Sequence, residues 1–173
     1  MMFLRHPVTA AAPGLCYGRL DVEVSEAGGR QIREVLEKLP RQTAIVSSPA
    51  RRCTTLALAI ASRDSISVIQ DLRLQEMDFG QWEGCAWNVL PRDQTDHWAE
   101  DPWERAPPGG ETFAAMFDRV ADGLAAAPKN ALIVTHAGVI RAARMILGGA
   151  SFDAVFSEAV PYCTPIQIIE QPL

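Results

Sequence analysis

The chain is predicted to adopt an α/β fold, a three-layer αβα sandwich with a mostly parallel central sheet and helices on both faces. Two observations lead to this prediction. Short apolar runs bounded by turn residues alternate with segments of helical periodicity, as buried parallel strands with crossover helices do. At 173 residues and 48% hydrophobic content, the chain is also long enough to bury the core of such a sandwich. We therefore expect a single domain over residues 1–173.

The first three strands are expected at residues 2–5, 43–47 and 66–69. The helix between the first two strands spans residues 25–38. Ser25 is its expected N-cap, because a serine hydroxyl can accept a hydrogen bond from the first helical turn. Gly28 and Gly29 weaken that turn, since glycine has a low helix propensity.

A second helix is expected to follow the second strand. Ser48 provides a serine N-cap, Pro49 suits the first helical position, and the helical pattern continues to Ser62. After the third strand, residues 71–110 show neither helical nor strand periodicity and contain tryptophans, prolines and acidic residues. Irregular segments of this length are commonly functional, so we expect this one to act as a lid or to carry part of the site.

The last third of the chain is expected to complete the sandwich. A helix over residues 111–127 is predicted because apolar side chains recur there at helical spacing, namely Phe113, Met116, Phe117, Val120 and Leu124. The remaining elements are a strand at 131–135, a helix at 138–147 closed by Gly148-Gly149, and a final strand at 166–169.

Composition and charge exclude several classes of function. The net charge of −5 and the absence of a Lys/Arg run predict no nucleic-acid partner and no attraction to anionic membranes. No apolar run approaches the roughly 20 residues of a membrane span, and the N-terminus does not resemble a signal peptide, so a cytoplasmic location is expected. The cysteines lack CxxC spacing, which favours reduced, mostly buried thiols at Cys16, Cys53, Cys85 and Cys163. The expected partner is a small molecule, and a homodimer is compatible with the sequence.

Two of the three histidines follow apolar strands directly. His6 comes after Arg5 at the end of the first strand, and His136 ends the fourth. Ligands of open α/β sheets bind beyond the carboxyl ends of the strands, where Arg51 or Arg52 of the second helix would also lie. A guanidinium fork matches phosphate oxygens, and a helix N-terminus adds amides and a positive dipole end. A phosphoryl group is therefore the expected ligand, although the local pattern does not choose between Arg51 and Arg52.

Histidine beside arginines is suited to phosphoryl transfer. A neutral imidazole is a good nucleophile toward phosphorus, and guanidinium groups neutralise the equatorial oxygens. The leaving alkoxide then needs a proton donor, for which a partly buried carboxylic acid is suitable. The irregular segment offers three such acids, Glu76, Asp78 and Glu83.

A metal site is the main chemical alternative. His6, His97 and His136 could nominally supply three nitrogen ligands to zinc. The neighbouring arginines would repel a dication, and the sequence contains neither HExxH nor HxH spacing. We expect no metal and no other cofactor.

Four motifs resemble those of the histidine phosphatase superfamily, also called the phosphoglycerate mutase-like proteins, and they occur in the same order. The resemblance spans nearly the whole chain and implies that family's αβα fold and a phosphatase activity through a phosphohistidine. The motifs are Leu4-Arg5-His6-Pro7-Val8-Thr9, Ser48-Pro49-Ala50-Arg51-Arg52-Cys53-Thr54-Thr55, Leu74-Gln75-Glu76-Met77-Asp78-Phe79-Gly80-Gln81-Trp82-Glu83-Gly84 and Thr135-His136-Ala137-Gly138-Val139.

The resemblance implies a role for each site residue. His6 would be the nucleophile and Glu76 the acid that later acts as base, with a phosphate pocket made of Arg5, Arg52 and His136. The spacing from Ser48 selects Arg52 as the functional arginine. A cationic His136 would add charge stabilisation of the transition state. Thr9 would contact the phosphate, and Tyr17 and Gly18 match positions near the substrate.

Some assignments stay open at this stage. Glu83 and Glu111 could each orient a substrate hydroxyl, but a carboxylate at the helix start, as Glu111 is, is favoured by the dipole regardless of function. Two residues depart from the family pattern. Pro7 replaces a glycine and loses a backbone N–H, and Ala12 stands where many members have asparagine, so one polar phosphate contact is expected to be missing.

Within the superfamily, the chain looks most similar to the α-ribazole phosphatases of cobalamin biosynthesis. This similarity rests on the acid motif together with Trp98, Asp101-Pro102-Trp103 and Pro107-Pro108-Gly109-Gly110-Glu111-Thr112. The tryptophans could offer flat surfaces to a benzimidazole base or could simply pack over the core. The short chain favours hydrolysis over transfer. A broad-specificity phosphatase and a mutase-like phosphotransferase remain alternatives, whereas a non-catalytic phosphate-binding module would need a damaged nucleophile or acid.

Overall fold

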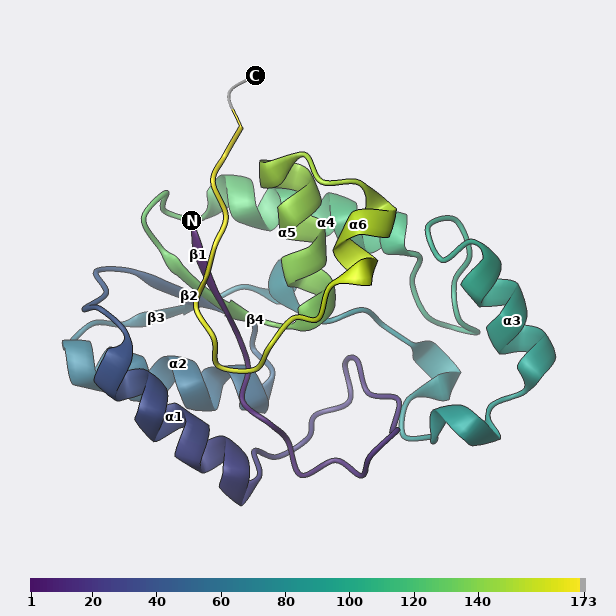
Figure 1. Ribbon diagram of the computed structural model, residues 1–173, viewed down its shortest axis with the longest axis horizontal. Helices are drawn as coiled ribbons and strands as arrows, with labels where there is room; N and C mark the ends of the chain where they lie inside the picture. The colour runs from purple at the N-terminus through teal and green to yellow at the C-terminus, as the bar shows by residue number, and fades with distance from the viewer. Residues whose placement is uncertain (172–173) are drawn as a thin grey trace.

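The computed structural model describes residues 1–171 and contains one five-stranded sheet with the strand order β3-β2-β4-β1-β5 (Figure 1). The strands are β1 (Met2–Arg5), β2 (Ile45–Ser47), β3 (Val68–Gln70), β4 (Leu132–Thr135) and β5 (Ile166–Gln167). The first four run parallel, and β5 pairs antiparallel with β1. The predicted mostly parallel sheet is confirmed; the last two residues of the predicted domain 1–173 lie outside the described residues.

Helices cover both faces of the sheet, as predicted (Figure 1). They are α1 (Glu26–Lys38), α2 (Arg51–Asp64), α3 (Arg92–Glu100), α4 (Phe113–Ala126), α5 (Ala137–Gly148) and α6 (Phe152–Ser157). In Figure 1, α1 and α2 lie below the sheet, whereas α4, α5 and α6 lie above it. This arrangement is the expected αβα sandwich.

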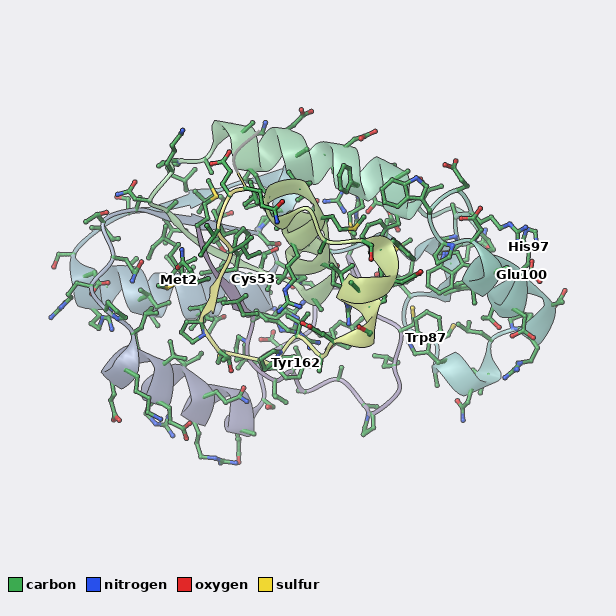
Figure 2. The ribbon with its side chains drawn as sticks, turned by 45° about the horizontal axis from the view of Figure 1, so that its top comes forward. Met2, Cys53, Trp87, His97, Glu100 and Tyr162 are labelled. Atoms are coloured by element: carbon green, nitrogen blue, oxygen red, sulfur yellow. The ribbon has the colours of Figure 1, made fainter. Side chains whose placement is uncertain are left out.

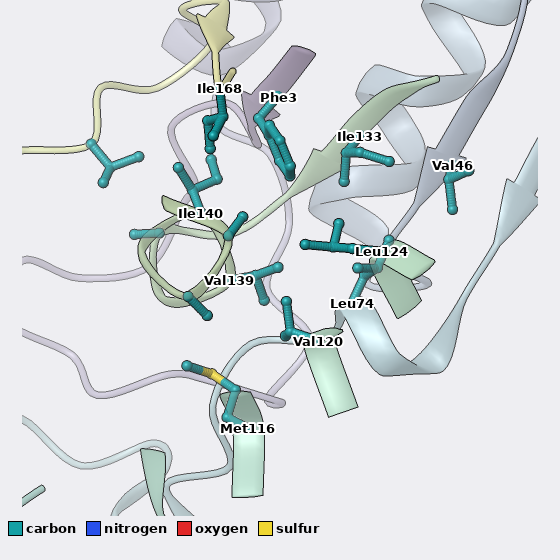
Figure 3. Packing of buried hydrophobic residues seen from close by; sticks show 14 of the residues in the cluster. Phe3, Val46, Leu74, Met116, Val120, Leu124, Ile133, Val139, Ile140 and Ile168 are labelled. Atoms are coloured by element: carbon teal, nitrogen blue, oxygen red, sulfur yellow. The ribbon is translucent and has the colours of Figure 1, made fainter. Parts of the chain in front are cut away.

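Alternation along each strand divides the core between the two faces. Phe3, Val46 and Ile133 point toward α4 and α5, where Figure 3 shows them packed with Val120, Leu124 and Val139. The neighbouring strand residues pack against α1 and α2, namely Leu4, Ile45, Leu132 and Val134. Because both faces of the strands are buried, the strands are apolar without interruption, which explains the continuous runs in the sequence.

The register of the sheet brings three strand ends together. Arg5 lies beside Thr135, and Ser47 lies beside Val134. The His6 N–H continues this pairing by donating to the Thr135 carbonyl at 2.9 Å. The residues that follow β1, β2 and β4 therefore meet at one edge, where α/β sheets bind their ligands.

One of the predicted helix caps is confirmed, and the predicted start of α2 is wrong. The Ser25 cap is confirmed, since its hydroxyl accepts from Gly28 N at 3.0 Å. Ser48, however, does not cap α2, which begins at Arg51 after Ala50, because the Ser48 hydroxyl bonds instead to His136. Thr112, not Glu111, caps α4.

Two helices were not predicted, α3 within the irregular segment and α6 near the C-terminus. The nine residues of α3 bury no side chain, so they lack the apolar repeat by which helices are detected. The six residues of α6 are fewer than two helical turns and cannot show a 3.6-residue period. The last strand is likewise shorter than the predicted 166–169. Within residues 1–171, no helix has the length and hydropathy needed to cross a membrane.

Glycines 28 and 29 offer a matched test of how α1 packs. A Cβ at Gly28 would lie 2.2 Å from the Val8 carbonyl oxygen, whereas one at Gly29 would meet no atom within 4 Å. We expect Gly28→Ala to lower the free energy of unfolding by about 2 kcal/mol through overpacking. Gly29→Ala should raise it by about 0.5–1 kcal/mol, because alanine favours the helix. Urea unfolding of the two variants measures both effects, and equal effects would contradict the packing assigned to Gly28.

Candidate active site

His6 follows β1 and is buried, with 2% of its surface exposed. Its Nδ1 lies 2.8 Å from the Pro7 carbonyl oxygen. Because a carbonyl oxygen can only accept a hydrogen bond, Nδ1 carries the proton and Nε2 keeps its lone pair. The His6 ring lies between two other rings, 5.2 Å from that of His136 and 5.5 Å from that of Tyr162. Nε2 of His6 is thus the free nucleophilic atom.

The surroundings of His6 keep its imidazole neutral. Burial lowers the pKa of His6 to about 3, and the charges of Arg52 and Arg5 act in the same direction, against the hydrogen bond to Pro7. A buried cation next to two other cations would lack solvent and counter-charge, which disfavours protonation. His6 is therefore neutral, and able to act as a nucleophile, across the physiological pH range.

Arg5 presents unused donors to the site. Its NH1 donates to the Val160 carbonyl at 2.6 Å, and its guanidinium carbon lies 3.7 Å from the centroid of the Tyr162 ring. Its Nε is buried and has no hydrogen-bond partner within residues 1–171. A buried guanidinium N–H without a partner is costly, so this donor indicates a place for an acceptor such as a phosphoryl oxygen.

Arg52 is the arginine of α2 that faces the site. It is fully buried, and its three nitrogens donate to Nδ1 of His136 and to the carbonyls of Gly18 and Leu20. The neighbouring Arg51 is exposed and pairs with Glu23 at 2.5 Å. Along the described chain no carboxylate lies within ion-pair distance of Arg5 or Arg52. Both guanidinium charges remain available to an anion.

His136 occupies the end of β4 but uses both ring nitrogens within the protein. Nδ1 accepts from Arg52 Nε at 3.3 Å, so Nε2 carries the proton and donates to the Ser48 hydroxyl at 2.8 Å. Burial and the charge of Arg52 lower the pKa of His136 well below its ordinary value. Without a bound anion, the arginines and the lack of solvent thus disfavour a positive charge on His136, and its charge with phosphate bound stays a prediction.

Glu76 lies beside this cluster on the irregular segment. Its two carboxylate oxygens accept from the backbone N–H groups of Met77 and Gly138, each at 3.1 Å. A cavity of about 280 Å³ opens between Glu76, His136, Gly18 and Ala50. A Cβ at Gly138 would lie 2.3 Å from Glu76 Oε1, so glycine is required for this close approach. These contacts hold the Glu76 carboxylate at the wall of the cavity. His136 lines the same cavity.

Glu83 and Gly18 form the framework of the site. The Glu83 carboxylate accepts from the backbone N–H groups of Arg19, Leu20 and Phe79. Gly18 packs so closely that an added Cβ would lie 1.8 Å from the Met77 carbonyl oxygen. These contacts join the loop that binds Arg52 to the acid segment, and they already use the Glu83 oxygens that were expected to orient substrate.

Glu111 has a similar framework role. It accepts from Asp78 N at 2.9 Å and forms an ion pair with Arg119 at 2.6 Å. Arg119, which sequence reasoning missed, also donates to the carbonyls of Arg73, Gln75 and Glu76. The Glu111 carboxylate thus links Arg119 within α4 to the backbone of Asp78 in the acid segment, whereas the N-cap hydrogen bond of α4 comes from Thr112. Arg119 had no distinguishing signal in the sequence beyond its place on the polar side of a predicted helix.

Two phenol rings lie over the arginines. Tyr17 was expected near the substrate, and its ring centroid lies 5.3 Å from the guanidinium carbon of Arg52. The Thr9 hydroxyl donates to the Tyr17 hydroxyl at 3.2 Å, so Thr9 lies beside the ring that faces Arg52, and the phosphate contact of Thr9 stays a prediction. Tyr162, which sequence reasoning missed, lies on the loop after α6 (Figure 2), and its backbone forms a parallel bridge with Arg5. It follows no motif or periodic pattern, so only a contact with Arg5 could have revealed it.

The tryptophans pack mainly against one another and the core. Trp82 is 2% exposed, and Trp87 stacks on Trp98 with ring centroids 6.1 Å apart. Trp103 packs on phenylalanines of α4 and α6. Trp98 differs from the others, because it also lines a second cavity beside Glu76, of about 100 Å³, and its buried Nε1 has no partner within the described residues.

The three histidines do not gather into one site. His97 lies on the exposed side of α3, at the far right of Figure 2, whereas Cys53, which contacts His136, lies near the centre. No three Asp, Glu, His or Cys side chains within residues 1–171 are placed to hold a metal ion. The arrangement of three histidines that the zinc alternative needed is therefore not formed by the described residues.

Comparison with known proteins identifies the family. The family model of the histidine phosphatase superfamily, branch 1, matches residues 1–170. The chain belongs to this superfamily. Phosphoserine phosphatase 1 of Hydrogenobacter thermophilus is 30% identical over 168 residues, which are 91% of this chain and 80% of that protein. The family assignment makes the chain a phosphatase of this superfamily.

Solved structures support the same assignment. A mycobacterial glucosyl-3-phosphoglycerate phosphatase in complex with VO3 is 28% identical, with a TM-score of 0.80 over 95% of this chain and 90% of that chain. The α-ribazole phosphatase from Shigella flexneri aligns with a TM-score of 0.85 over 98% of this histidine phosphatase and 95% of that chain, at 22% identity. At that identity the second comparison establishes the shared phosphoglycerate mutase-like fold alone.

The depressed pKa of His6 predicts a pH-dependent stability. The unfolded state binds a proton near pH 6.5 and the folded state only near 3, so His6 contributes stability above pH 6.5 that is lost as the pH falls toward 3. Between pH 7 and 5 this loss is about 2 kcal/mol. We expect His6→Asn to show a correspondingly smaller decrease in the urea-unfolding free energy. A decrease as large as that of the wild type would contradict the burial of a neutral His6.

Proposed function

We propose that this protein is a phosphomonoesterase that acts through a phosphohistidine at His6. The observation that carries the proposal is the state of His6, a buried neutral imidazole whose Nδ1–H is held by Pro7 and whose Nε2 keeps its lone pair beside two guanidinium groups. A nucleophile in this state needs no base, because it attacks phosphorus without losing a proton. Arg5 and Arg52 supply the positive charge that the phosphoryl oxygens require.

In the proposed first step, Nε2 of His6 attacks phosphorus and the P–O bond to the leaving group breaks. Glu76 gives its proton to the leaving oxygen. In the second step, Glu76 removes a proton from water, the hydroxide attacks phosphorus, and the N–P bond breaks to release phosphate. The cavity between Glu76 and His136 provides the route by which water reaches this position.

The arginines carry out the charge neutralisation that a metal ion performs in other phosphatases. Arg5 Nε is the free buried donor, and Arg52 is held at three nitrogens by carbonyls and His136. His136 positions Arg52 in this mechanism, and Thr9 adds a hydroxyl at the phosphate site. Turnover is accordingly expected to be unchanged by EDTA.

For the leaving group we propose α-ribazole, so that the substrate would be α-ribazole 5′-phosphate of cobalamin biosynthesis. The support is the acid motif and the aromatic wall beside Glu76, where Phe79 and Trp98 line the smaller cavity and Trp98 Nε1 has an unused N–H. That cavity, at about 100 Å³, would have to widen for a benzimidazole riboside. Phosphoserine is the second candidate, favoured by the 30% identity to a phosphoserine phosphatase.

A substrate screen distinguishes these candidates. Release of phosphate would be measured from α-ribazole 5′-phosphate, phosphoserine, glucosyl-3-phosphoglycerate and 4-nitrophenyl phosphate, each with the His6→Ala variant as control. The highest kcat/KM is expected for α-ribazole 5′-phosphate, and a higher value for phosphoserine would replace that assignment. Transfer of phosphate to an added alcohol in preference to water would favour the phosphotransferase alternative. No release from any ester would contradict the phosphomonoesterase proposal.

Substitution of the proposed acid should depend on the leaving group. Glu76→Gln cannot donate a proton, so turnover of an alkyl phosphate is expected to fall by roughly 10²–10⁴-fold. Turnover of the aryl ester 4-nitrophenyl phosphate should fall by about tenfold or less, because nitrophenolate leaves without protonation. The two values of kcat/KM measure this difference. Equal losses would remove Glu76 from the role of leaving-group acid.

Gly138→Ala should displace the acid without touching the phosphate site. The added Cβ lies 2.3 Å from Glu76 Oε1, so the carboxyl group must move. We expect kcat for an alkyl phosphate to fall at least about tenfold, since small misplacements of catalytic groups are costly. Gly148→Ala at the end of the same helix is the control, because its Cβ would meet only Ile168 at 3.8 Å. Similar kcat values for the two variants would show that Glu76 does not need this position.

A further inference from the structure

Tyr162 and Tyr17 lie over the two arginines of the site although they come from distant parts of the chain. The guanidinium carbon of Arg5 is 3.7 Å from the Tyr162 ring centroid, and that of Arg52 is 5.3 Å from the Tyr17 ring centroid. Both distances lie within the range in which an aromatic face attracts a cation. The shorter one places the Arg5 guanidinium directly on the Tyr162 ring.

The backbone fixes Tyr162 in this position. Tyr162 forms a parallel bridge with Arg5, and Cys163 N donates to the Arg5 carbonyl at 3.1 Å. The Val160 carbonyl accepts from Arg5 NH1 at 2.6 Å. The segment after α6 therefore holds Arg5 at its backbone, at one terminal nitrogen and on one face of the guanidinium, and leaves Nε unused.

An aromatic ring holds a cation without cancelling its charge. A carboxylate partner would neutralise Arg5 and compete with the phosphate for the same N–H groups. The face of a phenol ring attracts the guanidinium through its quadrupole, so the net positive charge and the guanidinium edge stay available. In keeping with this distinction, the described carboxylates pair with arginines other than Arg5 and Arg52, such as Arg73, Arg119 and Arg144.

We propose that Tyr162 is a positioning residue for phosphate recognition, whose ring fixes the plane of the Arg5 guanidinium so that the Nε edge faces the phosphoryl oxygens. The inference rests on the proposed phosphate chemistry of Arg5 and extends it to a residue outside the sequence motifs. Tyr17 holds Arg52 in the same manner at a longer distance. Burial raises the pKa of Tyr162, and the charge of Arg5 lowers it. The neighbouring Tyr17 phenol adds to the rise.

The proposal attributes the contribution of Tyr162 to orthophosphate affinity to its aromatic ring and not to its hydroxyl group. Variants at position 162 separate the two. Orthophosphate affinity, measured by isothermal titration calorimetry, should be within about twofold of the wild type for Tyr162→Phe, which keeps the ring. It should be about tenfold weaker for Tyr162→Leu, which keeps apolar bulk but loses the π face. The Michaelis constant for an aryl phosphate ester should rise in parallel with the loss of orthophosphate affinity.

Phe156 provides a matched control for orthophosphate binding, because its ring lies 4.9 Å from the guanidinium carbon of Arg141, an arginine not placed in the phosphate pocket. Both residues line the smaller cavity proposed for the leaving group, so this control compares orthophosphate affinity and not the Michaelis constant of an ester. Phe156→Leu is expected to leave orthophosphate affinity unchanged. An equal loss in Phe156→Leu and Tyr162→Leu would overturn the proposal, as would unchanged affinity in Tyr162→Leu. A loss in Tyr162→Phe equal to that in Tyr162→Leu would assign the effect to the hydroxyl and also overturn it.

A second series keeps the test decisive if Tyr162→Leu does not fold. Phenylalanine carrying one, two or three ring fluorines at position 162 keeps the shape of the ring while weakening its negative face. Orthophosphate affinity should fall stepwise with fluorination, and a constant affinity would contradict the proposal. Because calorimetry needs no turnover, wild-type binding of orthophosphate without hydrolysis of any ester would refute the proposed function and leave this test of Tyr162 intact.

Discussion

The arrangement of the site depends on the burial of the Arg52 guanidinium, which is shielded from solvent and has no carboxylate partner in the described part of the chain. A buried charge is costly unless its hydrogen bonds are satisfied. Here carbonyls of Gly18 and Leu20 and the ring of His136 satisfy them. Neutral acceptors stabilise the guanidinium without cancelling its charge, so a positive potential persists at the end of the sheet. Burial keeps His6 neutral and this potential acts in the same direction, while the same potential suits the proposed phosphoryl ligand.

The need to satisfy the hydrogen bonds of polar groups also explains how the segment that carries Glu76 is held. Residues 71–110 contain no strand and only short helical turns besides α3, so many of their backbone polar groups need other partners. Charged side chains supply them: Arg119 binds three carbonyls of the segment, and Glu83 binds three backbone N–H groups. Close glycine contacts bring these parts together. The Glu76 carboxylate is held in addition by the backbone N–H groups of Met77 and Gly138.

The residues that match the superfamily motifs and the aromatic residues outside those motifs thus lie mainly on different elements. Strand ends and the start of α2 carry the residues of the proposed phosphate site. The irregular segment and the loop after α6 add the aromatic side chains, among them Trp98 beside Glu76 and Tyr162 on Arg5. Differences in substrate among members of one fold are expected in such segments, because loops vary while the scaffold positions them.

The sequence by itself determined the strands, the long helices and the meeting of His6 with His136, because hydrophobic periodicity is local and parallel strands align their carboxyl ends. The resemblance to a family supplied Arg52 and Glu76. Only the tertiary structure showed that Ser48 binds His136 instead of capping α2, that Glu83 and Glu111 hold the framework, and that Arg119 and Tyr162 belong to the site. These roles depend on partners distant in the chain, which no local pattern encodes. The lowered pKa of His136 was equally hidden, since it follows from burial and from the charge of Arg52.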